Sequence, residues 1–237
     1  MSTIAKNIAK VGARIREAAQ ASNRDPSAIG LLAVSKTQSA DAIRAAFAAG
    51  QRDFGENYLQ EALDKQQQLS DLPLAWHFIG PIQSNKTRAI AEHFSWVHSV
   101  DRLKIAQRLS EQRPDNLPPL NICLQVNISG EDSKSGCQPH ELQDLALAVS
   151  ALPRLRLRGL MAIPQASEDP ARQRAVLASL RELQQNLHLD LDTLSMGMSA
   201  DLEAAVAEGS TWLRIGTAIF GARDYASADT EQETPPQ

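Results

Sequence analysis

The sequence predicts an α/β protein built as a single (β/α)₈ barrel, and three observations lead to that prediction. Eight short runs typical of β-strands alternate with segments of helical hydrophobic spacing, which indicates βα units and a parallel sheet. The chain has 237 residues, close to the roughly 250 that one such barrel needs. A further helical segment precedes the first strand and supplies an eighth helix. Because eight strands are the number for a closed barrel, we prefer a barrel to an open doubly wound sheet.

The elements follow one another in a regular order. The chain starts with an amphipathic segment, 2–21, whose apolar residues recur at helical spacing at Ile4, Ile8, Val11 and Ile15. We expect strands at Leu31–Ser35, Asp53–Gly55, Trp76–Gly80, Trp96–Val100, Ile122–Ile128, Leu157–Ile163, Thr193–Met198 and Trp212–Phe220. We expect helices between them at Ala40–Ala49, Leu59–Leu69, Lys86–His93, Arg102–Gln112, His140–Ala151, Ala171–Leu187 and Ala200–Glu208.

The two ends of the chain complete this organisation. The last strand has no helix after it, and we expect the N-terminal helix to cover that gap. The barrel domain is predicted over residues 1–225. Residues 226–237 are polar, contain two prolines and lack aromatic residues, so we expect a disordered tail.

Composition excludes several classes of protein. The chain has 24 Lys and Arg against 28 Asp and Glu, a net charge of −4, which argues against a nucleic-acid-binding protein with a basic face. It contains no apolar run of about 18 residues and no secretory signal, so we expect neither a membrane span nor export. Cys123 and Cys137 fit a reducing, cytoplasmic compartment, and Cys123 lies in an apolar run typical of a core residue.

The histidines and cysteines do not predict a metal site. His93, His98 and His140 have no metal-ligand spacing with one another or with the cysteines. His77 lies in a predicted strand between Trp76 and Phe78, which is typical of a core histidine or of one that supports a ligand-binding residue.

Lys36 is the first candidate for chemistry. Functional residues of such barrels lie at the C-terminal ends of the strands, and Lys36 ends the apolar run of the first strand. Burial there would lower the pKa of the amine, and a neutral amine attacks an aldehyde to form a Schiff base. The alternative is an ordinary lysine whose ammonium reaches solvent at a strand end.

Two segments near the C-terminus are candidate phosphate contacts. Ser195–Ser199 leads from the seventh strand into a helix, Gly197 permits close backbone approach, and Ser199 is a candidate N-cap. Asp201 and Glu203 would repel a phosphate, so they must face away from it. The alternative is an ordinary capped helix.

The second candidate segment is 214–217. Gly216 leaves room for a ligand, and Thr217 offers a hydroxyl and a backbone N–H. Phosphate sites of these barrels commonly use the loops after strands seven and eight. Together with Lys36, the two segments indicate a site for a phosphate-bearing ligand that forms an imine. They leave two functions equally open: a protein that binds an aldehyde ligand, and a class I aldolase that forms an imine with a sugar phosphate.

Several motifs resemble the pyridoxal phosphate homeostasis protein family over roughly residues 5–225. They are Val-Ser-Lys-Thr at 34–37, Phe-Gly-Glu-Asn-Tyr at 54–58, Trp-His-Phe-Ile-Gly-Pro-Ile-Gln-Ser-Asn-Lys at 76–86, His-Ser-Val-Asp at 98–101, Gln-Val-Asn at 125–127, Arg-Gly-Leu-Met-Ala-Ile at 158–163, Leu-Ser-Met-Gly-Met-Ser at 194–199 and Arg-Ile-Gly-Thr-Ala-Ile-Phe-Gly at 214–221. The resemblance implies the fold-type III barrel of alanine racemase and pyridoxal 5′-phosphate (PLP) as cofactor.

The same resemblance implies a set of cofactor-binding residues. Lys36 would carry PLP as an imine, with Asn57 beside the ring and Arg214 at the pyridine nitrogen. The phosphate would be held by Ser199, Gly216 and Thr217. An arginine is effectively always charged, so at this position it disfavours protonation of the ring and makes the ring a poorer electron sink.

The resemblance also implies that the protein binds PLP for vitamin B6 homeostasis and does not convert amino acids, so we predict no catalytic residue. A racemase of this fold needs a second acid–base residue, a tyrosine from a separate domain of a partner chain, and neither Tyr58 nor Tyr225 matches that position. A racemase-like enzyme remains the alternative. We expect a monomer with PLP as ligand, and apo PLP-dependent enzymes are candidate recipients.

Overall fold

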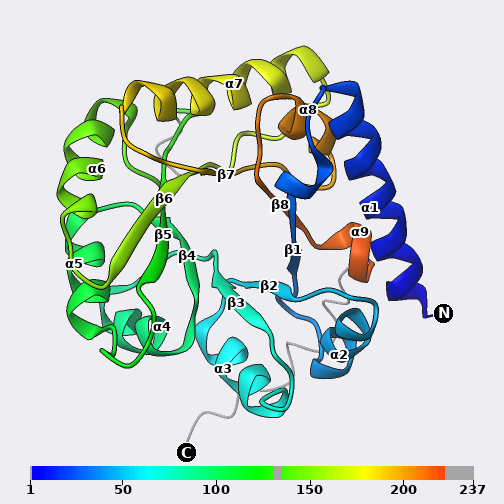
Figure 1. Cartoon of the computed structure of the whole chain (residues 1–237), viewed down its shortest axis with the longest axis horizontal. Helices are drawn as coiled ribbons and strands as arrows, with labels where there is room; N and C mark the ends of the chain where they lie inside the picture. The colour runs from blue at the N-terminus through cyan, green and yellow to red at the C-terminus, as the bar shows by residue number, and fades with distance from the viewer. Residues whose placement is uncertain (1, 131–134, 222–237) are drawn as a thin grey trace, which may run out of the picture.

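A computed structural model gives the structure of residues 2–130 and 135–221 (Figure 1). Eight parallel strands form a closed barrel in chain order, β1 to β8. The strands are β1 Gly30–Val34, β2 Asp53–Glu56, β3 Ala75–Phe78, β4 Trp96–Val100, β5 Leu120–Gln125, β6 Leu155–Met161, β7 Thr193–Ser195 and β8 Trp212–Ile215. The predicted (β/α)₈ barrel is therefore confirmed.

The helices form a ring around the strands, as Figure 1 shows. The α-helices are α1 Thr3–Ala21, α2 Ala40–Ala48, α3 Leu59–Gln68, α4 Thr87–His93, α5 Leu103–Gln112, α6 Leu142–Ser150, α7 Pro170–Asn186, α8 Leu202–Ala207 and α9 Thr217–Phe220. Three short 3₁₀ turns lie at Pro26–Ala28, Ser84–Lys86 and Pro139–Glu141.

Six strands, β1, β3, β5, β6, β7 and β8, end earlier than the sequence predicts, and the cause is clear for the last two. The predicted strand over 212–220 is wrong beyond Ile215, because the chain turns at Gly216 into α9, which buries Ile219. The predicted strand over 193–198 ends at Ser195, and Gly197 then adopts a φ of +94°. Only glycine adopts that conformation readily, so the chain leaves the sheet at this point.

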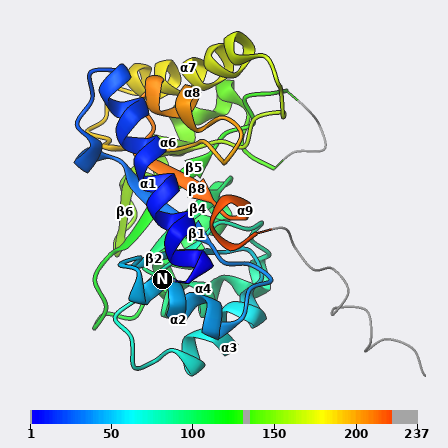
Figure 2. The same ribbon diagram turned by 90° about the vertical axis from the view of Figure 1, so that its right-hand side faces the viewer.

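The N-terminal helix completes the outer ring. Ser2 caps α1 by accepting a hydrogen bond from the N–H of Ala5, and the helix buries Val11 and Ile15 among others. It packs against α2, α8 and α9, and Figure 2 shows it running alongside the last two helices. The amide of Asn7 donates to the carbonyl of Ile219 over 2.9 Å. The N-terminal helix thus covers the region after the last strand, as expected, but the expectation that no helix follows that strand is wrong, because the short helix α9 does.

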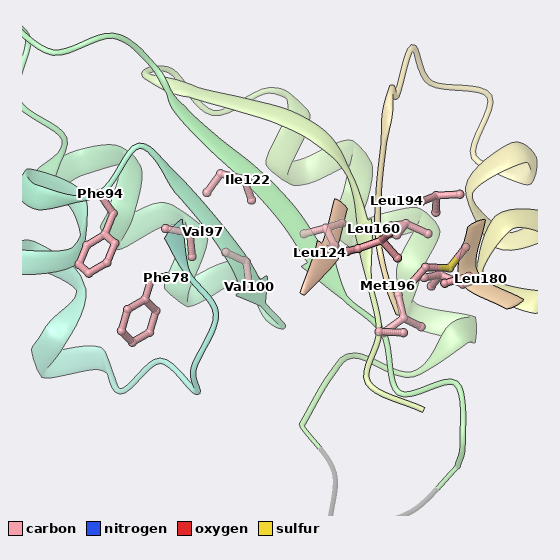
Figure 3. Packing of buried hydrophobic residues seen from close by; sticks show 14 of the residues in the cluster. Phe78, Phe94, Val97, Val100, Ile122, Leu124, Leu160, Leu180, Leu194 and Met196 are labelled. Carbon is pink, nitrogen blue, oxygen red and sulfur yellow. The ribbon is translucent and has the colours of Figure 1, made fainter. Parts of the chain in front are cut away.

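The apolar core lies mainly between the barrel and the helices. Figure 3 shows part of it, with Phe78 and Phe94 on one side and Leu160 and Leu194 on the other. The two phenylalanine rings meet edge to face, with centroids 5.3 Å apart. Burial of such side chains stabilises the fold by roughly 25 cal/mol for each Å² of apolar surface removed from water. This layer fixes the strands, and with them the residues at the strand ends.

Some predictions fall outside the residues described. The predicted tail, 226–237, lies there entirely, and so does most of the polar loop 131–136. Among residues 2–130 and 135–221, the structure contains no helix with the length and apolar character needed to cross a membrane.

Candidate cofactor-binding site

A cavity of about 260 Å³ lies at the C-terminal ends of the strands. Its polar lining consists of the six residues predicted from the sequence, namely Lys36, Asn57, Ser199, Arg214, Gly216 and Thr217. Apolar surface comes from Val34, Ile79, Ile163, Met198 and Ala200. Because the described residues of the lining include two cationic side chains and no carboxylate, the cavity suits an anionic ligand.

The backbone on both sides of Lys36 is held in place. Lys36 follows β1 and is half-buried at the cavity. The residue before it, Ser35, accepts a hydrogen bond at its carbonyl from the ammonium of Lys65 over 2.7 Å. The residue after it, Thr37, has a φ of +63° and donates its N–H to the carboxylate of Glu61 over 2.6 Å. A β-branched residue with positive φ is strained by about 1–3 kcal/mol, so these contacts maintain an otherwise unfavourable turn.

A buried ionic cluster provides these contacts. Lys65 pairs with Glu56 over 2.9 Å and also with Glu61, and the hydroxyl of Ser35 donates to Glu56 over 2.6 Å. Glu56 and Lys65 are 0% and 5% exposed, so the charges are removed from water. Burial raises the pKa of Glu56, while Lys65 and the hydroxyl of Ser35 oppose that rise. We call Ser35, Glu56, Glu61 and Lys65 the lysine clamp, because it fixes the backbone that carries Lys36.

The sequence alone did not single out Lys65. A lysine on an amphipathic helix normally reaches solvent, so its burial was unexpected. The available signal was the spacing of Glu61 and Lys65, which places both on one face of α3.

Asn57 follows β2 and presents a buried amide to the cavity. Its Oδ1 is buried and has no hydrogen-bond partner within residues 2–130 and 135–221. Buried amide oxygens are normally paired, so this atom is suited to accept from a bound ligand. Its backbone is held close to Gly80, where an added Cβ would lie 2.3 Å from the carbonyl oxygen of Asn57.

Ser199 lines the cavity, but it is not the N-cap of the next helix. That prediction is wrong, since α8 begins at Leu202 and Asp201 precedes it. The carboxylate of Asp201 turns back to accept from the N–H of Met198 over 2.6 Å, which shortens the helix at its start. Glu203 pairs with Arg14 on α1 over 2.9 Å. Neither acid lines the cavity, as the sequence argument required.

Gly216 and Thr217 lie where β8 ends and α9 begins. The first N–H groups of a helix have no partner within the helix, so the start of α9 offers donors next to the hydroxyl of Thr217. A Cβ at Gly216 would lie 3.2 Å from the carbonyl oxygen of Val34, so glycine permits this close packing against β1.

Arg214 extends its guanidinium from β8 toward the ends of β7 and β6. Nη1 donates to the carbonyl and to the hydroxyl of Ser195, over 2.6 Å and 2.9 Å, and Nη2 donates to the carbonyl of Ala162 over 2.8 Å. Burial lowers the pKa of Arg214 to about 10, which still leaves it charged at neutral pH. The sequence did not single out Ser195 as its partner.

The other predictions have mixed outcomes. His77 and His98 are both buried inside the barrel and hydrogen-bonded to each other. From the sequence, His98 was considered only as a metal ligand, and its place in the core was not predicted. Cys123 is a buried core thiol, as predicted. The described residues contain no cluster of His, Cys, Asp and Glu able to hold a metal. Tyr58 is 57% exposed and does not line the cavity, while Tyr225 lies outside the described residues.

Comparison with known proteins gives the same family from sequence and from structure. The model of the alanine racemase N-terminal domain matches residues 6–224. The pyridoxal phosphate homeostasis protein of Pseudomonas aeruginosa is 74% identical over 227 residues, which cover 96% of this chain and 99% of that protein. The protein of the same name from Escherichia coli K12 is 56% identical over 232 residues, covering 95% and 99% of the two chains.

Solved structures agree with this assignment. PipY of Synechococcus elongatus, solved with PLP bound, is 41% identical and superposes with a TM-score of 0.81 over 92% of this chain and 100% of PipY. Alanine racemase of Corynebacterium glutamicum is 18% identical with a TM-score of 0.67, over 93% of this chain and 61% of the racemase, and shares the fold. The chain therefore belongs to the alanine racemase N-terminal domain family and, within it, to the pyridoxal phosphate homeostasis proteins.

Proposed function

We propose that this chain binds PLP in the cavity described above and serves PLP homeostasis. One observation carries the proposal: the six residues expected to hold PLP, from four different strand ends, line one cavity, whose lining in the described part of the chain has two cations and no carboxylate. PipY, which shares the fold at 41% identity, has been solved with PLP bound. A cavity of about 260 Å³ is suited to a small cofactor, since drug-sized ligands occupy pockets of roughly 300–1,000 Å³.

Each residue of the cavity binds a different part of the ligand. Lys36 supplies the amine for a Schiff base with the aldehyde. Thr217, Gly216 and Ser199 would supply hydroxyl and backbone donors for the phosphate. Arg214 would face the ring nitrogen. The unpaired Oδ1 of Asn57, buried beside the cavity, accepts from the ligand.

The composition of the cavity favours binding over conversion of amino acids. PLP supplies an electron-withdrawing ring when bound, but an enzyme also needs a second acid–base group within reach of the substrate carbon. Lys36 and Arg214 are the only titratable side chains among the described residues of the lining, and a charged Arg214 disfavours protonation of the ring. We therefore propose a carrier that has no amino-acid-converting activity.

Three further expectations belong to the same proposal. The protein acts in the cytoplasm, where its two free thiols remain reduced. It works as a monomer. Its recipients are apo forms of PLP-dependent enzymes, which take PLP when another amine replaces Lys36 at the aldehyde.

The attachment is tested by a visible spectrum of the purified protein with PLP, before and after borohydride reduction, followed by peptide mapping. We expect a visible band that reduction removes, and a phosphopyridoxyl group on the peptide containing Lys36. Lys36→Ala should remove the label from that peptide, whereas Lys104→Ala, at an exposed lysine on α5, should not. A wild-type protein labelled mainly at another lysine would refute the assignment.

The same samples test the two alternative functions. Stereospecific exchange of the α-proton of an amino acid in deuterated water would support a racemase-like enzyme. A protein that gains no band with PLP, yet is trapped by borohydride with a ketose phosphate, would support an aldolase-like enzyme.

A further inference from the structure

A chain of hydrogen bonds crosses the inside of the barrel and ends at Arg214. The carboxylate of Asp53 lies 3.1 Å from Nε2 of His77, and Nδ1 of His77 lies 2.9 Å from Nε2 of His98. Nδ1 of His98 lies 2.7 Å from the hydroxyl of Ser195, which accepts from Nη1 of Arg214 over 2.9 Å. We call these five residues the interior relay.

The interior relay joins the two ends of the barrel. Asp53 is the first residue of β2, and its side chain is 30% exposed at the end opposite the cavity. Arg214 lines the cavity at the other end. Between them His77, His98 and Ser195 are each 0% exposed. Bulky aliphatic side chains usually fill such barrels, so a continuous polar chain in this place requires an explanation.

The orientation of the imidazoles is fixed by their neighbours. The ring of His77 stacks on Trp96, with centroids 5.5 Å apart and planes 2° apart, and meets Trp212 edge to face at 5.0 Å. These contacts hold His77 with one nitrogen toward Asp53 and the other toward His98. Each buried polar group of the relay is thereby paired, which avoids the cost of an unsatisfied group in the core.

The direction of every hydrogen bond follows from the two ends. A guanidinium only donates and a carboxylate only accepts. Burial lowers the pKa of His77 and of His98, so both imidazoles are neutral and each has one donor and one acceptor nitrogen. Nε2 of His77 therefore donates to Asp53, which leaves its Nδ1 to accept from Nε2 of His98. Nδ1 of His98 then accepts from the hydroxyl of Ser195, whose oxygen accepts from Arg214.

All donors of the relay thus point from Arg214 toward Asp53. The hydroxyl and the two imidazoles present the negative ends of their dipoles toward the guanidinium, and hydrogen bonds in such a chain strengthen one another. With the carbonyls of Ser195 and Ala162, the relay engages three of the five N–H groups of Arg214. The guanidinium plane is held by Ser195, at the end of β7, and by Ala162, directly after β6.

We propose that Asp53, His77, His98 and Ser195 are positioning residues for Arg214, which keep its guanidinium charged and directed at the ring nitrogen of bound PLP. This inference rests on the proposed function. Through Arg214, the polar residues inside the barrel keep the ring nitrogen of the bound ligand unprotonated. A residue outside the cavity, at the opposite end of the barrel, therefore influences the electronic state of the ligand.

The test uses PLP labelled with ¹⁵N in the ring, bound to the full chain. The ¹⁵N chemical shift reports whether the ring nitrogen carries a proton, and the visible band gives the Kd. For the wild-type protein we expect the shift of an unprotonated nitrogen. Ser195→Ala and His98→Phe should move the shift toward the protonated value and raise the Kd about tenfold, since each leaves a buried partner unpaired. Asp53→Leu, which removes the acceptor of His77, should move the ¹⁵N shift in the same direction.

Two controls separate this role from general damage to the fold. Ser110→Ala also removes a buried hydroxyl, one that donates to the carbonyl of Pro153, and should leave the ¹⁵N shift and the Kd unchanged. Asp53→Leu changes a partly exposed side chain, so it tests the relay in a protein that folds even if the core variants do not. Wild-type values for Asp53→Leu, and for any folded Ser195→Ala or His98→Phe protein, would overturn the relay. Failure of the wild-type protein to bind PLP would overturn the proposed function together with it.

Discussion

The ammonium of Lys65 donates to the backbone carbonyl of Ser35 over 2.7 Å, so a lysine of α3 holds the residue that precedes Lys36. The two lysines have different tasks because their surroundings differ. Lys36 lines the cavity, whereas Lys65 is 5% exposed and lies between Glu56 and Glu61. Four predictions follow from these and related contacts.

Loss of the Lys65 ammonium should damage both stability and binding. Lys65→Met leaves Glu56 and Glu61 without their cation, and breaking a buried pair in this way costs about 3–5 kcal/mol. Urea unfolding measures the loss of stability, and a PLP titration should show weaker binding because the backbone at Lys36 is released. Lys104→Met, at an exposed position on α5, serves as the control. Equal stability of the two variants would contradict the role of the lysine clamp.

Gly197 should be needed for the shape of the cavity. Gly197 and Gly50 have φ values of +94° and +98°, so alanine strains both by about 1–2 kcal/mol. A Cβ at Gly197 would also lie 2.4 Å from the Cβ of Ala205, whereas a Cβ at Gly50 meets nothing within 4 Å. Gly197→Ala should therefore displace Met198 and Ser199 and weaken PLP binding, while Gly50→Ala leaves the Kd unchanged. Equilibrium titration of both variants with PLP measures the Kd, and equal Kd values would contradict the prediction.

Acid should destabilise the protein through its buried histidines. The folded pKa values of His77 and His98 lie below the ordinary value of 6.5, so below that pH the unfolded chain binds protons that the folded chain does not. The contribution of the two histidines to stability is fully present above pH 6.5 and is lost as the pH falls toward their folded pKa values. For His98, whose folded pKa lies well below 6.5, the loss is about 1.4 kcal/mol per pH unit.

Replacement of one histidine tests this slope. His98→Gln removes one titrating group, so the slope of the unfolding free energy between pH 6 and pH 5 should fall by about 1.4 kcal/mol per pH unit. His93→Gln, at an exposed position, should keep the wild-type slope. The measurement is urea unfolding at each pH, and identical slopes for all three proteins would contradict a neutral His98 in the core.

The two cysteines should resist modification while the protein is folded. Burial raises the pKa of Cys123, and it raises that of Cys137 to about 12, so neither thiol forms the reactive thiolate at neutral pH. We expect Ellman's reagent to react with both thiols only in denaturant. Rapid reaction of the native protein, mapped to either cysteine, would contradict this prediction, because it would show that the core around that cysteine opens.

The sequence by itself determined the barrel and the six residues of the cavity. Alternating strand and helix patterns indicate parallel strands, whose C-terminal ends meet at one mouth of a closed barrel. Lys36, Asn57, Ser199, Arg214, Gly216 and Thr217 follow or end such strands, and the structure places them around one cavity. The order of the elements predicts that strand ends meet at one mouth, and the resemblance of the motifs to a known family distinguishes these six residues from other polar residues at strand ends.

The tertiary structure alone decided the lysine clamp, the helix start at Asp201 and the interior relay. Ser195 and His98 are 97 residues apart in the sequence, and His77 and His98 are 21 residues apart. No local pattern joins residues so distant, and no propensity shows that Lys65 is buried. The burial and the hydrogen-bond partners of a polar side chain depend on which other elements pack over it, and only the closed barrel fixes that packing.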